Sequence, residues 1–247
     1  MYEERRYRGV FKSKDLVSFT VNQKETDIFV AIDKNKKRNL KDIIAQTEYF
    51  ISDLRRDIES YIKNYPIFEL SFRPVAVDSD APEVIREMAQ AAFLTNVGPF
   101  AAVAGAIAGM LGRKLSEEIS DVIVENGGDI FIKTTKPRRV GIYSVSDEIS
   151  NRVGLEILPG DTPLGICASS GTEGHSFSFG RADLALAVSN STALADACAT
   201  AIGNLIKERE DVIKGINFAK NIEGIKGILI VKDGHFGFWG DIKIIRI

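Results

Sequence analysis

Alternating hydrophobic and polar residues predict a β-hairpin followed by a long helix in the first quarter of the chain. Residues 16–21 and 27–32 are apolar or alternating, and they flank the polar residues 22–26, as in a hairpin. From residue 40 to residue 62 the apolar positions recur at helical spacing, and Tyr65-Pro66 ends the pattern. We therefore expect one amphipathic helix whose charged positions face solvent.

The next pattern predicts two further helices separated by a break. Residues 80–95 form one helical pattern with Pro82 in its first turn, and residues 99–115 form another that is rich in small residues. Residues 91–112 carry no charge and are long enough to cross a bilayer. Because Asn96-Val97-Gly98-Pro99 interrupts this stretch, we expect two closely packed core helices and no membrane partner.

The second half of the chain alternates between short strands, turns and helices. Asn126-Gly127-Gly128 is a strong hairpin signal. The expected strands are residues 122–124, 130–133, 138–143, 153–157, 183–188, 227–231 and 236–247. Helices are expected at residues 192–210 and 211–218, and loops at residues 159–163 and 165–176. This order predicts an α+β fold with one compact core and no internal repeat.

Length and composition fit a single domain in a reducing compartment. The chain has 247 residues, of which 45% are hydrophobic, and its net charge is -2. So small a net charge creates no overall electrostatic field that would attract nucleic acid or an anionic membrane. Two cysteines, with a charged N-terminal stretch, indicate a cytoplasmic setting. We divide the domain into residues 1–95, 96–203 and 204–247, of which the second carries the motifs.

Asp196 and Thr200 are the first candidate site. They are four residues apart in a predicted helix, so both side chains lie on one helix face. Oxygen ligands of this kind suit Mg²⁺, which commonly takes one or two protein carboxylates. The structural alternative is a carboxylate near a helix N-terminus beside a threonine bonded to its own backbone.

The predicted turn from Asn126 to Asp129 is the second candidate. Gly127 and Gly128 would let the backbone approach a ligand closely, and Asp129 could orient a sugar or a metal-bound water. A plain hairpin turn is the alternative. Arg138, which begins a later strand, could contact phosphate or could simply lie at an exposed strand end.

The stretch from Gly165 to Ser176 is the third candidate. Its small residues could offer backbone donors to phosphate: Ser169, Ser170, Gly171 and Thr172. Cys167 could act as a nucleophile if a base such as His175 lowered its pKa. The alternative is a buried, inert Cys167 beside a flexible loop.

Together and in this order, the three stretches resemble the ApbE family of FAD:protein FMN transferases, and most closely an uncharacterised ApbE-related family. Asn126-Gly127-Gly128-Asp129 resembles the family's glycine-glycine turn, residues 168–171 its threonine-serine-glycine segment, and residues 195–201 its ADALATA-type helix. The resemblance implies an α+β fold with antiparallel sheets. It also implies that Asp196 and Thr200 bind magnesium beside the FAD pyrophosphate.

The chain departs from the transferases in two segments. Residues 96–105 stand where the family has a DLGGIAKG-type segment, and they lack its aspartate and lysine. The HILDP-type segment is replaced by residues 174–180.

Three hypotheses follow. The first is a magnesium-assisted flavin or nucleotide enzyme, such as a transferase. The second is a sulfur-handling protein with a persulfide on Cys167, because the related family is linked to sulfide assimilation into cysteine or homocysteine. The third is a non-catalytic flavin- or ligand-binding protein. The helix at residues 99–115 could also form a homodimer contact.

Overall fold

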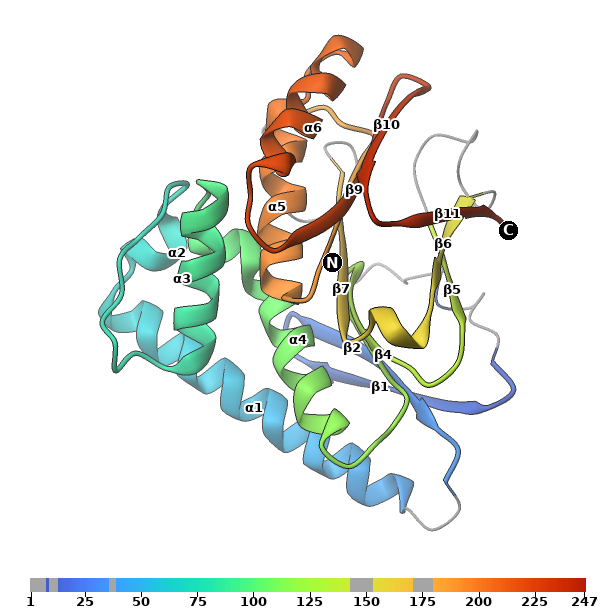
Figure 1. Ribbon diagram of the computed structural model, residues 1–247. Coiled ribbons are helices and arrows are strands. Elements are labelled where there is room, and N and C mark those ends of the chain that lie inside the picture. The colour runs from blue at the N-terminus through green and yellow to red at the C-terminus, as the bar shows by residue number, and fades with distance from the viewer. Residues whose placement is uncertain (1–7, 9–12, 36–38, 143–152, 171–179) are drawn as a thin grey trace.

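The computed structural model describes residues 8, 13–35, 39–142, 153–170 and 180–247. Its central feature is an eight-stranded antiparallel sheet in the order β1-β2-β3-β4-β7-β8-β9-β10 (Figure 1). Its strands are β1 (Leu16–Gln23), β2 (Thr26–Asp33), β3 (Val122–Asn126), β4 (Asp129–Lys133), β7 (Leu164–Ser169), β8 (Leu184–Ser189), β9 (Ile225–Lys232) and β10 (His235–Gly240). Both predicted hairpins of the N-terminal and central regions are confirmed.

A separate three-stranded sheet has the order β11-β6-β5, formed by β5 (Arg138–Gly141), β6 (Val153–Ile157) and β11 (Lys243–Arg246). The short strands expected from residues 138 and 153 are thus present, and they belong to this second sheet. The predicted terminal strand 236–247 is also divided, because Gly240 adopts a positive φ of 96° and redirects the chain between β10 and β11.

The helices follow the sequence pattern with small changes at their ends. They are α1 (Leu40–Asn64), α2 (Ile67–Leu70), α3 (Glu83–Thr95), α4 (Val103–Ser116), α5 (Thr192–Leu205) and α6 (Val212–Lys220), with 3₁₀ turns η2 (Pro99–Ala102), η3 (Pro159–Asp161) and η4 (Arg209–Asp211). The helix expected to reach residue 210 ends at Leu205, since Ile206 is extended.

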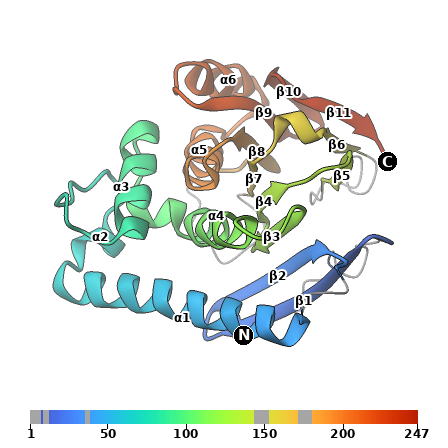
Figure 2. The same ribbon diagram turned by 60° about the horizontal axis from the view of Figure 1, so that its bottom comes forward.

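Strand alternation places apolar side chains on both faces of the main sheet. Val30, Val124 and Phe131 point toward the helices, whereas Ile132 and Ile166 point toward the small sheet. Figures 1 and 2 show α4 and α5 along one face and β5, β6 and β11 beyond the other. The sheet thus has a hydrophobic layer on each side.

The small-residue helix α4 is a core element. Ala106, Ala108 and Leu111 are fully buried, as the spacing of small residues predicted. In the described part of the chain no single helix is long and apolar enough to cross a membrane. Glu83–Thr95 and Pro99–Ser116 reach that length and composition only as a pair bent by 104°.

Candidate functional site

The site begins at the turn between β3 and β4. Asp129 follows this turn, and pairing of Ile130 with Ile166 places Asp129 beside Cys167 of β7. Side chains alternate along each strand, so Asp129 and Cys167 both point to the face that carries the helices. The fold therefore brings the second and third candidate stretches together.

Helix α5 brings Asp196 to the same place. Its first turn is capped by Ser191, whose side chain accepts a hydrogen bond from the Leu194 N–H. One turn later, the Asp196 Oδ2 atom accepts a hydrogen bond of 2.8 Å from the Gly105 N–H of α4. The Asn126 side-chain amide donates to the Ala104 carbonyl at 3.2 Å. The start of α4 thus contacts both the first and the second candidate stretch.

The two aspartates carry unusual electrostatics. Burial, followed by the charge of Asp196, raises the pKa of Asp129 well above its ordinary value, although contact with Cys167 opposes this. Burial raises the pKa of Asp196 to about 7, and the hydrogen bond from Gly105 opposes that shift. Among the described residues, the Asp129 Oδ1 atom accepts no hydrogen bond. Burial and the neighbouring negative charge therefore favour the protonated form of Asp129, and a positive group beside it would oppose this.

Cys167 lies in the middle of β7, so the expectation that it belongs to a loop is wrong. It is fully buried, and its thiol donates to the Thr192 carbonyl across 3.4 Å. Burial, and then the nearby charges of Asp129 and Asp196, raise the pKa of the thiol well above its usual value. These features favour a protonated thiol and weigh against a nucleophilic role. His175, its predicted partner, lies outside the described residues.

Residues at the end of β7 and of the β3–β4 turn border the aspartate pair. Ser169 and Ser170 are half-buried, and Gly127 is exposed. Gly127 and Gly128 have positive φ angles of 69° and 102°, and a Cβ atom on Gly128 would meet nothing within 4 Å. Gly171 and Thr172 lie outside the described ranges.

Thr200 lies one turn beyond Asp196 on α5 and is half-buried. The spacing of four residues places both side chains on one helix face, as the sequence predicted.

The sequence reasoning missed Arg8. Its guanidinium contacts Glu125 at 2.5 Å and Asp27 at 2.7 Å on the sheet face opposite Asp129. Glu125 also accepts a hydrogen bond of 2.8 Å from the Gly128 N–H. Arg8 therefore stabilises the β3–β4 turn indirectly, through its ion pair with Glu125. One arginine among the three in residues 1–10 carries no sequence signal for this role.

The site fits a magnesium ion in its chemistry. Within the described ranges no group of three or more His, Cys, Asp or Glu residues is arranged to hold a metal ion. Mg²⁺ does not need such a group, because it commonly binds one or two carboxylates and keeps several waters. The unpaired Asp129 oxygen beside Asp196 is the observation that such a cation would explain.

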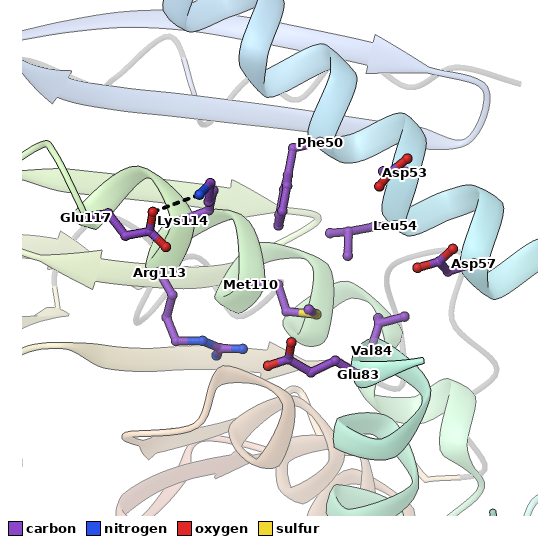
Figure 3. A pocket seen from close by; sticks show the side chains of 10 residues that line it. All are labelled: Phe50, Asp53, Leu54, Asp57, Glu83, Val84, Met110, Arg113, Lys114 and Glu117. Atoms are coloured by element: carbon purple, nitrogen blue, oxygen red, sulfur yellow. Dashed lines mark hydrogen bonds and ion pairs between the residues drawn. The ribbon is translucent and has the colours of Figure 1, made fainter. Parts of the chain in front are cut away.

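A separate pocket of about 320 Å³ lies between α1, α3 and α4 (Figure 3). Phe50, Leu54 and Met110 contribute apolar surface to it. Its charged lining residues are Asp53, Asp57, Glu83, Arg113, Lys114 and Glu117. Arg113 is paired with Glu87 and Lys114 with Glu117. None of the sequence-predicted site residues lines this pocket, so it is distinct from the aspartate pair.

Comparisons with known proteins agree with this architecture. The family model described as "AbpE bacteria" matches residues 8–222. A UPF0280 protein of Methanocaldococcus jannaschii is 38% identical over 224 residues, covering 89% of this chain and 88% of the relative. A UPF0280 protein of Methanosarcina barkeri is 38% identical over 221 residues, covering 89% and 85%.

Solved structures share the fold at low identity. The flavin transferase ApbE from Vibrio cholerae has a TM-score of 0.64 and 15% identity, with 91% of this chain and 96% of that chain covered. The apo flavinyl transferase ApbE of Pseudomonas stutzeri has a TM-score of 0.61 and 13% identity, covering 93% and 95%. The chain therefore belongs to the family described as "AbpE bacteria", together with the UPF0280 proteins, and has the fold of the ApbE flavin transferases.

Proposed function

We propose that this protein binds a flavin nucleotide such as FAD with the help of a magnesium ion at Asp196 and Thr200. The observation that carries this proposal is the approach of Asp196 to the buried Asp129, with neither carboxylate paired to Lys, Arg or His in the part of the chain described. Proteins that share the fold are named flavin transferases, which favours a flavin over other nucleotides.

Each residue of the site has a distinct role in this proposal. The Gly105 N–H orients the Asp196 carboxylate, and Thr200 presents a hydroxyl on the same helix face. A bound magnesium ion would supply positive charge for the oxygens of a pyrophosphate. Backbone N–H groups at the end of β7, beside Ser169, would donate to the phosphates.

Two residues of the turn already form hydrogen bonds within the fold. The Gly128 N–H donates a hydrogen bond to the Glu125 carboxylate, and the Asn126 side-chain amide donates one to the Ala104 carbonyl. Among the turn residues, Gly127 and Asp129 therefore remain for the ligand. Gly171 and Thr172 continue the same chain segment and stay predictions.

The reaction that best fits the fold is group transfer from a flavin nucleotide, as the names of the related structures suggest. A specific observation favours a second candidate, a flavin-binding protein without transfer activity. Residues 96–105 lack the aspartate and lysine of the transferase segment, and Gly105 instead bonds Asp196 directly. Ligand binding without turnover would distinguish the second candidate from the first. The sulfur-handling alternative is less well supported, because Cys167 is buried and its burial raises the pKa of the thiol, which disfavours the reactive thiolate.

Isothermal titration with FAD, FMN and ATP, each with and without magnesium, tests the proposal. Wild-type protein should bind a flavin nucleotide only with magnesium, and Asp196→Asn should weaken that binding about tenfold or more. Asparagine keeps the shape of the side chain and can still accept the Gly105 hydrogen bond.

The matched control for this titration is Asp211→Asn. Asp211 accepts hydrogen bonds from the Lys207 and Glu208 N–H groups beyond the end of α5. It is not one of the proposed site residues, so Asp211→Asn should leave the affinity for the nucleotide unchanged. Equal affinity in wild type and Asp196→Asn, or silence of the wild type toward every ligand, would sink the proposal.

A further inference from the structure

Strand β10 forms one edge of the main sheet. In the described part of the chain it pairs only with β9 (Figure 1). Helix α6 covers one face of this edge, since a Cβ atom on Gly237 would lie 2.3 Å from the Val212 side chain and 2.9 Å from that of Ile216. The backbone groups on the outer side of an edge strand can pair with a further strand.

The turn before β10 determines which of its backbone groups point outward. Both residues of the two-residue turn between β9 and β10 have positive φ angles, 47° and 73°, as in a type I′ hairpin turn. Such a turn closes on a hydrogen-bonded pair, which here is Lys232 and His235. Inward and outward positions alternate along an antiparallel strand. The N–H and C=O groups of Phe236 and Phe238 therefore point away from β9.

The side chains of the same two residues are exposed. Phe236 is 50% exposed and Phe238 is 63% exposed. Both point to the face opposite α6, because they pair with Val231 and Leu229, which belong to the hydrophobic layer beneath the small sheet. Large apolar side chains along an unpaired edge are typical of a strand that pairs with another chain.

The other edge of the main sheet is protected by charge, and β10 is not. Strand β1 has Lys14 and Asp15 before it and Lys24 directly after it. Strand β10 contains no Asp, Glu, Lys or Arg. Charged side chains at an edge oppose pairing with a second copy, whereas two copies of β10 would meet without like charges opposite each other. The charge pattern therefore permits self-pairing at β10.

We propose that β10 pairs with β10 of a second copy of this chain, antiparallel, across a two-fold axis. Such a contact is closed, because each copy uses the same edge. Opposite residues of an antiparallel pair share a face, so Phe236 and Phe238 of both copies lie together on the face opposite α6.

The size of this contact fits a reversible dimer. The two phenylalanines expose roughly 200 Å² of apolar surface in each copy. Together with one strand edge, this surface makes an interface at the small end of specific interfaces. We therefore expect a Kd in the micromolar range. The inference does not depend on the proposed function.

Sedimentation velocity at about 1 to 100 µM protein tests the inference on wild type, Phe238→Lys and Phe93→Lys. Wild type should shift from one copy to two as its concentration rises. Phe238→Lys should raise the Kd of the dimer about tenfold or more, because it brings like charges together across the axis. Phe93→Lys is the matched control, since Phe93 is 76% exposed on α3, far from β10 (Figures 1 and 2).

Amide hydrogen exchange of wild type at both ends of this concentration range is the second measurement, and it needs no variant. The Phe236 and Phe238 N–H groups should exchange more slowly in the dimer. Three results would overturn the inference. They are a wild type that stays a single copy at every concentration, equal loss of the dimer in both variants, and a dimer in which these N–H groups exchange as fast as in the single copy.

Discussion

At the scale of single residues, the absence of a side chain at Gly105 decides how the site is built. The backbone N–H of this glycine reaches Asp196 because α4 and α5 can touch there. Gly109, one turn further along α4, faces Thr192 more loosely, since a Cβ atom would lie 3.2 Å from its side chain. The segment that most clearly departs from the transferase motif therefore still contributes to the site, through its backbone.

Gly105→Ala should destabilise the protein by about 1–3 kcal/mol, because the new methyl group overlaps a backbone carbonyl that cannot move aside. Alanine's better helix propensity, worth about 1 kcal/mol, offsets only part of this. Urea unfolding measures the loss. Gly160→Ala is the matched control, since nothing lies within 4 Å of its Cβ position. Equal stability of Gly105→Ala and wild type would contradict the packing described.

At the scale of elements, Arg138 ties the small sheet to the main one. From β5 it donates to both oxygens of Asp15, each at 2.9 Å, and to Asp121 at 3.2 Å. Asp15 directly precedes β1 and Asp121 directly precedes β3. The expectation that Arg138 could contact phosphate is therefore not supported, because its donors are used within the fold.

Acid should weaken this link. Burial raises the pKa of Asp121, but hydrogen bonds from Thr135, Thr134 and Arg138 together outweigh it and lower the pKa. Hydrogen bonds from Arg138, Ser13 and Lys136 hold the pKa of Asp15 below its usual value. A lowered folded-state pKa gives stability that is complete above about pH 4 and is lost as the pH falls.

Arg138→Met should remove much of this acid dependence and cost about 1–3 kcal/mol at pH 7, because two carboxylates lose a shared donor. Urea unfolding from pH 7 down to pH 3 measures both effects. An acid-induced loss as steep as that of wild type would show that the link does not contribute.

At the scale of the whole molecule, the main sheet separates two hydrophobic layers, and the candidate site belongs to only one of them. Asp129 and Cys167 face the helices, whereas Leu155 of β6 packs with Ile166 and Leu229 on the other face. Changes in the layer beneath the small sheet should therefore affect stability without altering the site.

Leu155→Ala tests this separation. Leu155 is 1% exposed, so its truncation should cost about 2–4 kcal/mol through lost burial and a cavity. Flavin-nucleotide affinity should stay at the wild-type value, as measured by titration well below the unfolding temperature. A large loss of affinity in a folded Leu155→Ala variant would mean that the sheet transmits changes from one layer to the other.

The sequence alone determined most helices and strands, the β3–β4 turn, the close packing of α4 and the shared face of Asp196 and Thr200. These features depend on local periodicity and turn residues, which a short window of sequence contains. Only the tertiary structure decided that Cys167 is a buried strand residue, that β11 joins a second sheet and that Arg8 supports the turn. It also decided that Asp129 and Asp196 lie together. Strand register and helix crossing join residues far apart in the chain, and no local pattern specifies those contacts.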